Sequence, residues 1–219
     1  MKITKLGHSC LLLCDIGDKK RRFLIDPGIL TVAEHSKLTD IDAVFYTHEH
    51  PDHLDIPSLK RILTINNDAV VVTNSSVGAL LEAENITFQC LEKTDEDTIM
   101  DVLVQAHDGA HAEIFEDFGQ VQNTGYLFDG SLYLPGDSLA VPPFPVEVMA
   151  LVVAGPFCPV RDARRFAEAV SPKVVFPVHD GQLNAIGLEP WQRVVTGIFA
   201  NSTVKYVHLA AGESYVVPQ

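Results

Sequence analysis

The sequence predicts a mixed α/β fold in which sheet forms the middle of the molecule and helices cover it. Short apolar runs of strand length dominate the chain, and each is stopped by Gly, Pro, Asp or His. Amphipathic helical patterns are fewer and follow several of these runs, an order typical of layered α/β proteins. The 219 residues contain no fixed-period repeat and no obvious linker, so we expect one domain over 1–219.

The first predicted element is a β-hairpin. The runs "CLLLCDI" (10–16) and "RRFLID" (21–26) flank a turn at Gly17 and Asp18. Further apolar runs bounded by turn residues predict strands at 42–47, 69–73, 98–106, 125–128, 131–134, 148–155, 173–178, 204–209 and 213–217.

Four segments repeat apolar residues at spacings of three and four, which predicts helices over 56–64, 75–85, 160–171 and 190–201. Ser75 or Ser76 is the expected cap of the second helix, and Pro190 is expected at the start of the last. The proline-rich stretch "VPPFPVE" (141–147) is interpreted as a rigid loop.

Composition excludes several classes of function. Lys and Arg number 16 against 29 Asp and Glu, and a formal charge of −13 opposes binding to nucleic acid or anionic lipid. The basic run "KKRR" (19–22) falls at the hairpin turn and is interpreted as solvated. No run approaches the roughly 20 apolar residues of a membrane span. The sequence "LLLC" (11–14) is similar to a lipoprotein cleavage site, but Leu13 is not small and the polar "GHS" (7–9) interrupts the apolar stretch, so we expect no signal peptide.

The four cysteines form no C-x-x-C pair. Without an export signal they predict reduced thiols in a cytoplasmic protein.

The stretch "THEHPDHLD" (47–55) follows an apolar run and contains an H-x-H-x-D-H pattern. In an extended loop, residues two apart point the same way, so His48 and His50 can bind one metal ion together. Pro51 forces a bend, after which Asp52 and His53 point elsewhere, toward a second ion. Imidazole and carboxylate without thiolate suit zinc, and also manganese or iron.

Polar residues stand at the carboxyl ends of other predicted strands, where sites built on sheets are usually assembled. They are Asp26 in "FLIDPG", His107 and His111 in "VLVQAHDGAHAEI", Asp137 in "LYLPGDS" and His179 in "VVFPVHDG". Each is a candidate partner for the histidine cluster.

The order of these motifs resembles that of the metallo-β-lactamase-fold hydrolases over nearly the entire chain. The matching motifs are "IDPG", "THEHPDH", a histidine after the next long strand, "PGD" and "PVHD". Within that superfamily, the motifs "GHS", "HAEI", "NTGYLFDGSLYLPGDSL" and "VVFPVHDGQL" are most similar to the compact branch related to ascorbate-6-phosphate lactonase. The resemblance implies a four-layer αββα sandwich with a two-metal site at one sheet edge.

Carried over by position, the resemblance assigns two ligand sets. His48, His50 and a third histidine hold the first ion; Asp52, His53 and His179 hold the second. Asp137 bridges the two ions and Asp26 orients ligands, a role that suits an acidic partner of a coordinating histidine.

The third histidine is open between two residues. Strand geometry favours His107, whereas the context "GAHAEI" resembles the family motif and favours His111, which we choose. His107 is kept as an alternative near the site, and His8 in "LGHSC" as a candidate pocket residue.

The resemblance implies hydrolysis of a small ester, lactone or phosphoester by a hydroxide bridging two divalent ions, with zinc favoured and manganese or iron acceptable. The expected partner is a small-molecule substrate, with no nucleic acid and no membrane; the sequence does not indicate an oligomeric state. Asp52, metal-bound water and His8 are the candidates to protonate the leaving group. Two alternatives remain: an iron-dependent oxidoreductase of the same fold, and a non-catalytic metal-binding protein.

Overall fold

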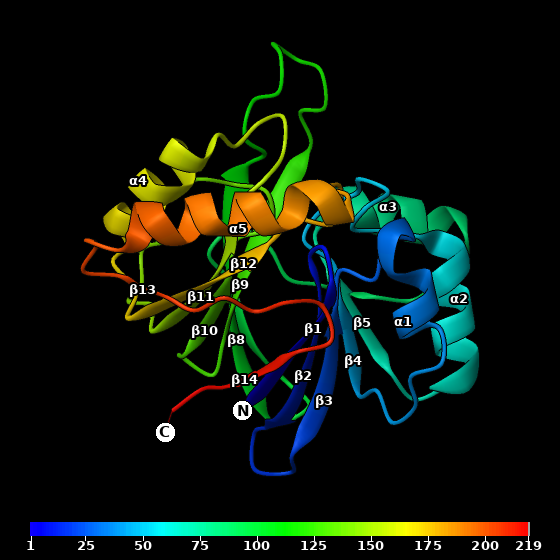
Figure 1. The fold of residues 1–219 in the computed structure, drawn as a ribbon. Helices are drawn as coiled ribbons and strands as arrows, with labels where there is room; N and C mark the ends of the chain where they lie inside the picture. Colours follow the sequence, from blue (N-terminus) through cyan, green and yellow to red (C-terminus); the bar gives the residue numbers. More distant parts are fainter. Residues whose placement is uncertain (219) are drawn as a thin grey trace.

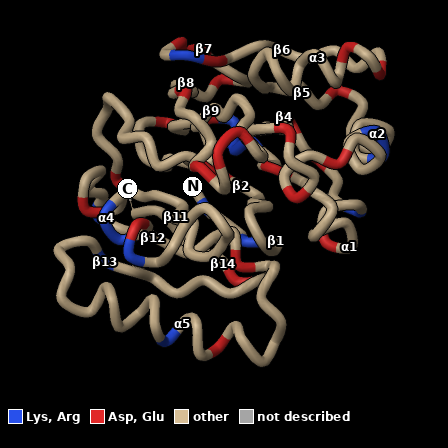
Figure 2. The backbone as a smooth tube through the Cα atoms, turned by 90° about the horizontal axis from the view of Figure 1, so that it is seen from above, with Lys and Arg blue, Asp and Glu red and all other residues tan. Residues whose placement is uncertain are grey.

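The structure is a computed structural model that describes residues 1–218. Two seven-stranded sheets pack face to face and helices cover their outer faces (Figure 1). Seen from above, α1, α2 and α3 gather on one side of the molecule and α4 and α5 on another (Figure 2). The predicted mixed α/β fold and the four-layer sandwich are confirmed.

The first sheet has the order β14-β1-β2-β3-β4-β5-β6. Its strands are β1 (Lys2–Gly7), β2 (Cys10–Ile16), β3 (Arg21–Ile25), β4 (Ala43–Phe45), β5 (Val70–Thr73), β6 (Gln89–Cys90) and β14 (Ser214–Val216). The antiparallel pair β2 and β3 is the predicted hairpin, and β3 to β6 run parallel. β1 was not predicted from the sequence, because the buried Lys5 interrupts its apolar pattern.

The helices of the first half are η1 (Ile29–Thr31), α1 (Val32–His35), α2 (Ile56–Ile65) and α3 (Ser75–Ala83). Apolar residues of α2 and α3 pack against the outer face of the first sheet and form a core of their own. We expected Ser75 or Ser76 to cap α3, and this prediction was wrong because the N-cap is Asn74. Asn74, which precedes Ser75 and Ser76, accepts a hydrogen bond from the backbone N–H of Val77 at 3.0 Å.

The second sheet has the order β13-β12-β11-β10-β9-β8-β7. Its strands are β7 (Glu96–Ile99), β8 (Val102–Ala110), β9 (Gln122–Phe128), β10 (Leu132–Leu134), β11 (Val148–Val152), β12 (Val174–Val178) and β13 (Lys205–Tyr206). The single strand predicted at 98–106 is a hairpin, because Met100 and Asp101 adopt left-handed conformations with φ of 49° and 72° and form a turn. Of the strand predicted at 204–209, only Lys205–Tyr206 forms a strand, β13.

The helices of the second half are α4 (Val160–Val170) and α5 (Ala185–Phe199). The structure contradicts the prediction that Pro190 starts the last helix. The side chain of Asn184 accepts the N–H of Gly187 at 2.9 Å, so the helix begins five residues earlier and Pro190 lies inside it. Within residues 1–218, none of the helices is both long and apolar enough to cross a bilayer.

The two sheets bury the main core between them and bring several strand ends together. β8 is antiparallel to β9, β9 is antiparallel to β10, and β10 to β12 run parallel. The carboxyl ends of β8, β10 and β12 therefore meet at one edge of the second sheet. β3, β4 and β5 end likewise at one edge of the first sheet. This arrangement positions the loops that carry the predicted site residues.

Candidate metal centre

Eight side chains converge in two groups where these strand ends meet. In each group the ligand atoms lie within 4.8 Å of one another. The first group is His48, His50, His111 and Asp137; the second is His8, Asp52, His53 and His179. All seven residues predicted as ligands lie in these groups, and His8 joins them.

Asp137 lies between the two groups. Its Oδ2 atom is 3.0 Å from Nε2 of His179 and 3.4 Å from Nε2 of His53. The Nε2 atoms of His111 and His48 lie 3.5 Å and 3.7 Å from the same oxygen. One carboxylate oxygen thus faces imidazoles of both groups, which is the position required of a bridging ligand.

The turn before Asp137 depends on Gly136. Gly136 has a φ of 62°, and a Cβ atom there would lie 2.2 Å from Oδ1 of Asn123 and 2.9 Å from Cβ of Thr47. The same Asn123 oxygen accepts the backbone N–H of Asp137 at 2.9 Å. A side chain at position 136 would push Asp137 away from the imidazoles.

Backbone carbonyls orient two of the histidines. Nδ1 of His111 lies 2.7 Å from the carbonyl oxygen of Ala112, and Nδ1 of His179 lies 2.7 Å from that of Ala154. A carbonyl only accepts hydrogen bonds, so each Nδ1 carries the proton. Nε2, which faces the centre, is the atom that can offer a lone pair to an ion.

Asp26 orients two further histidines of the cluster, His53 and His48. Its Oδ2 atom accepts hydrogen bonds from Nδ1 of His53 and from the hydroxyl of Thr47, each at 2.8 Å. Because that hydroxyl donates to Asp26, its oxygen is free to accept the Nδ1 proton of His48, 3.0 Å away. One carboxylate therefore fixes the tautomers of His53 directly and His48 through Thr47.

The inward atoms of the cluster lack hydrogen-bond partners among the described residues. Nε2 of His48, His53 and His111 and Oδ1 of Asp137 are all buried and unpaired. Buried polar atoms in proteins are nearly always satisfied, and leaving several unsatisfied at one point is costly. Divalent ions bound among these lone pairs would satisfy them, so the donor set fits a metal centre.

The charge states of His48, His50 and Asp137 agree with this interpretation. Burial lowers the pKa of His48 and of His50, which keeps both imidazoles neutral at pH 7. Burial alone would raise the pKa of Asp137, but His53 and His179 hold that pKa well below its ordinary value. Burial opposes protonation of His179, yet Asp137 beside it raises its pKa to about 9. An ion bound to His179 would have to displace that proton.

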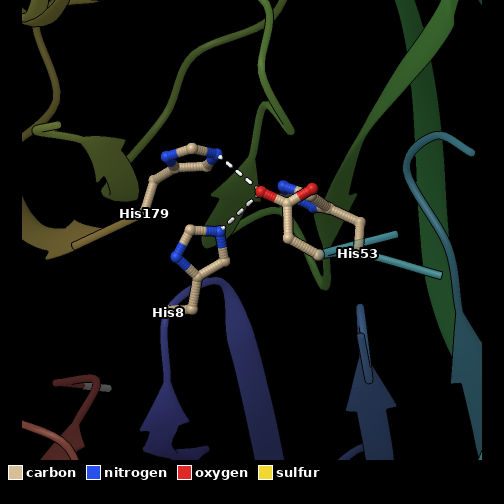
Figure 3. A group of neighbouring side chains, drawn as sticks. His8, His53 and His179 are labelled. Carbon is tan, nitrogen blue, oxygen red and sulfur yellow. Dashed lines mark hydrogen bonds and ion pairs between the residues drawn. The ribbon is translucent and has the colours of Figure 1, made fainter. Parts of the chain in front are cut away.

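His8 differs from the other histidines in its tautomer. The backbone N–H of Gly181 donates to Nδ1 of His8 at 3.2 Å, so this nitrogen holds the lone pair and Nε2 holds the proton. Nε2 lies 3.1 Å from Oδ2 of Asp52, to which it donates. Figure 3 shows His8, His53 and His179 grouped together. The ring centroids of His8 and His179 are 4.1 Å apart. His8 is therefore a hydrogen-bond donor to Asp52 and not a source of a free lone pair.

His107 does not reach the cluster, and the suggestion from strand geometry that it might is wrong. Val102, Val104 and Ala106 of β8 are buried in the core between the sheets. Successive side chains of a strand point to opposite faces, so His107 points away from that core, and its ring lies 6.2 Å from that of Phe144. His111 occupies the position instead.

Some residues that orient the clustered histidines and Asp52 were not predicted from the sequence. Thr47 directly precedes the histidine motif and could have been noticed as a hydroxyl beside Asp26 and His48. Gln182, whose Nε2 lies 3.4 Å from Oδ2 of Asp52, follows the "PVHD" motif. The carbonyls of Ala112 and Ala154 leave no signal in a sequence, because every residue has one.

Comparison with known proteins gives the family. A family model described as a β-lactamase superfamily domain matches residues 2–179. Protein Rv0786c of Mycobacterium tuberculosis is 32% identical over 184 residues, which cover 82% of this chain and 84% of that protein. A UPF0173 metal-dependent hydrolase of Alkaliphilus metalliredigens is 29% identical over 208 residues, covering 87% of this chain and 90% of its own.

Among solved structures, the metallo-β-lactamase fold protein YhfI of Bacillus subtilis has a TM-score of 0.72 and 14% identity, with 98% of each chain covered. That likeness concerns the fold alone. Together with the match of the family model, it shows that this chain belongs to the β-lactamase superfamily and has the metallo-β-lactamase fold.

Proposed function

We propose that the protein is a dinuclear metal-dependent hydrolase. The observation that carries the proposal is the convergence of buried Nε2 atoms from His48, His53 and His111 on Asp137, with no partner for these nitrogens among the described residues. A cation between these converging atoms would satisfy all of them at once, which supports the proposal.

Each proposed ion has its own ligands. His48, His50 and His111 would hold the first ion, and Asp52, His53 and His179 the second. Asp137 would contact both, since its Oδ2 faces imidazoles of both groups. Nitrogen and carboxylate ligands favour zinc, and manganese or iron would also be accepted.

Bound ions would supply a strong nucleophile derived from water at neutral pH and stabilise negative charge on the substrate. The protein's own residues supply position and proton control. Asp137 sets the spacing of the two groups, and Asp26 keeps two imidazoles in the correct tautomer. Asp52 is held by His8 and Gln182, and its side chain is 19% exposed. It is therefore the acidic group of the centre best placed to meet an entering substrate.

The proposed substrate is a small ester, lactone or phosphoester. The name of the Alkaliphilus relative, a metal-dependent hydrolase, supports hydrolysis. The resemblance to the branch of ascorbate-6-phosphate lactonase suggests a lactone or related ester. We also propose a cytoplasmic location, which suits four cysteines that form no disulfide.

The first test combines elemental analysis with two histidine variants. We expect close to two zinc or manganese ions per chain in protein purified without chelators. His111→Ala should lose metal and hydrolytic activity together, because it removes a nitrogen from the first group. His107→Ala is the matched control and should keep both, because that ring faces away from the centre.

Circular dichroism and thermal unfolding would verify that both variants are folded. Full metal content and activity in His111→Ala would contradict the ligand assignment. Iron with oxygen-consuming turnover would favour an oxidoreductase. Full metal loading without hydrolysis of any ester, lactone or phosphodiester in a broad panel would favour a non-catalytic metal-binding protein.

A further inference from the structure

A cavity of about 460 Å³ adjoins the metal centre on the side of His8. It lies between the end of β1, the segment of η1 and α1, the first turns of α5 and residues 208–211. Apolar side chains dominate its lining, among them Leu6, Leu30, Leu183 and Leu188. Its size suits part of a small organic molecule, since ligand pockets usually span about 300–1,000 Å³.

The buried polar groups around this cavity are already paired within the protein. Asp180 accepts hydrogen bonds from Nζ of Lys5 at 2.7 Å and from Nε2 of Gln192 at 3.1 Å. The oxygen of Gln192 accepts the hydroxyl of Tyr206 at 2.6 Å. His8 is bonded through both ring nitrogens. A ligand that needs many hydrogen bonds, such as a sugar, would find few free partners here.

The charge of the lining disfavours an anion. No Lys or Arg is among the described residues that line the cavity, whereas Glu34 and Glu189 line it and are exposed. The buried charge of Lys5 is matched by Asp180. Figure 2 shows α5 almost free of charged residues, with one acidic and one basic segment along its length. Within the cavity itself, a phosphate would meet no Lys or Arg side chain among the described lining residues and would face the carboxylates of Glu34 and Glu189.

The cavity and the metal centre share a wall. His8 lines the cavity and also donates to Asp52 of the second group. Gly181 lines the cavity, and the next residue, Gln182, contacts Asp52 from the exposed side. A group bound in the cavity would therefore lie beside the part of the centre that solvent reaches.

We propose that this cavity binds the apolar acyl or aryl group of an uncharged substrate. This inference rests on the proposed hydrolase function and narrows its substrate class to neutral esters or lactones with an apolar portion. The inference disfavours phosphorylated sugars for two reasons. The cavity has no basic side chain to bind the phosphate, and it has few unpaired polar groups to bind the sugar hydroxyls.

The first experiment measures binding without requiring activity. N-phenyl-1-naphthylamine is an uncharged apolar dye that fluoresces when it leaves water, and we expect it to bind the metal-loaded protein. Leu188→Trp fills the cavity and should weaken dye binding by about tenfold or more. Val194→Trp places the same side chain on the same helix at an exposed position outside the lining, and should bind the dye as the unmodified protein does.

The second experiment measures turnover along a series of p-nitrophenyl esters from acetate to octanoate. We expect kcat/KM to rise with chain length in the unmodified protein and in Val194→Trp. In Leu188→Trp the ratio of octanoate to acetate turnover should fall by about tenfold, since the longer chain loses its apolar site.

The outcomes separate the two proposals. Dye binding that Leu188→Trp leaves unchanged, or no dye binding at all, would overturn the cavity proposal. Ester turnover with no dependence on chain length would overturn the cavity as a substrate pocket and leave the hydrolase standing. Dye binding lost in Leu188→Trp, with no ester hydrolysed by fully loaded protein, would overturn the hydrolase and leave the cavity as a ligand site only.

Discussion

Thr47 connects several parts of the candidate centre through its backbone and its hydroxyl. Its backbone N–H and its hydroxyl both donate to Asp26, at 2.8 Å each, and its oxygen accepts from His48. Its carbonyl accepts the N–H of Thr124 in β9 and the side-chain amide of Asn74. The residue thereby ties the histidine loop to Asp26 and to the opposite sheet.

We predict that Thr47→Val lowers metal affinity while Thr47→Ser preserves it. Valine keeps the shape of threonine but removes the hydroxyl that links Asp26 to His48. Loss of such an orienting contact typically costs about tenfold to a hundredfold in metal affinity. Competition with a chromogenic zinc chelator measures the affinity. Equal affinities in the Val and Ser variants would show that the hydroxyl does not position His48.

For single residues, the sequence predicted which side chains form the site better than it predicted the orientation and tautomer of each histidine. The pattern from His48 to His53 predicted a cluster because its residue types and spacing are specific, and the structure brings these side chains together in two groups that could hold ions. Their tautomers depend on what faces each Nδ1, and for His111 and His179 that is a backbone carbonyl brought close by the fold. The role of His8 depends in the same way on the N–H of Gly181, a contact between residues 173 positions apart.

At the scale of elements, long apolar runs were predictable and short or interrupted ones were not. β11 and β12 are apolar throughout, so their positions followed from the sequence. β1 was missed because its buried Lys5 is paired with Asp180, a partner far along the chain. The break in 98–106 was missed because the left-handed conformations of Met100 and Asp101 need no glycine or proline.

The start of α3 provides a prediction about pH. Glu92 accepts the backbone N–H of Ser75 at 2.8 Å and the amide of Gln122 at 2.9 Å, and hydrogen bonds from Ser75 and Gln122 lower its pKa to about 2. A carboxyl whose pKa is lower in the folded than in the unfolded state stabilises the protein above its unfolded pKa. That contribution is lost as the pH falls from about 4.5 toward about 2.

We therefore expect Glu92→Gln to reduce the free energy of unfolding by about 1–2 kcal/mol at neutral pH. The variant should also lose less stability than the unmodified protein between about pH 6 and about pH 3.5, since glutamine does not titrate. Urea unfolding at both pH values measures this. Glu82→Gln is the control, because Glu82 is exposed on α3, the helix whose first residue Glu92 contacts. Parallel pH profiles for Glu92→Gln and the unmodified protein would contradict the assignment.

At the scale of the whole molecule, the candidate centre connects the two sheets. His48, His50, Asp52 and His53 follow β4 of the first sheet, whereas His111, Asp137 and His179 follow β8, β10 and β12 of the second. Each of the two groups contains ligands from both halves. Motif order and the family resemblance predicted the two sets of residues but placed the site at one sheet edge, whereas the structure places it where strand ends of both sheets meet. The adjoining cavity was not predictable, because its walls come from four separate segments of the chain.

Since the proposed ions bind both halves in the folded state only, they should stabilise the sandwich as a whole. Each ion at about 100 times its dissociation constant adds about 2.7 kcal/mol, which for a chain of this size corresponds to a rise of roughly 5–11 °C in Tm for one ion and about twice that for two. Removing the ions with a chelator should lower the Tm by that amount, and adding zinc back should restore it. His111→Ala should show a much smaller shift, because the first ion then lacks a ligand from the second sheet. His107→Ala should behave like the unmodified protein. A Tm that is the same with and without ions would mean that the cluster holds no ion across the two sheets.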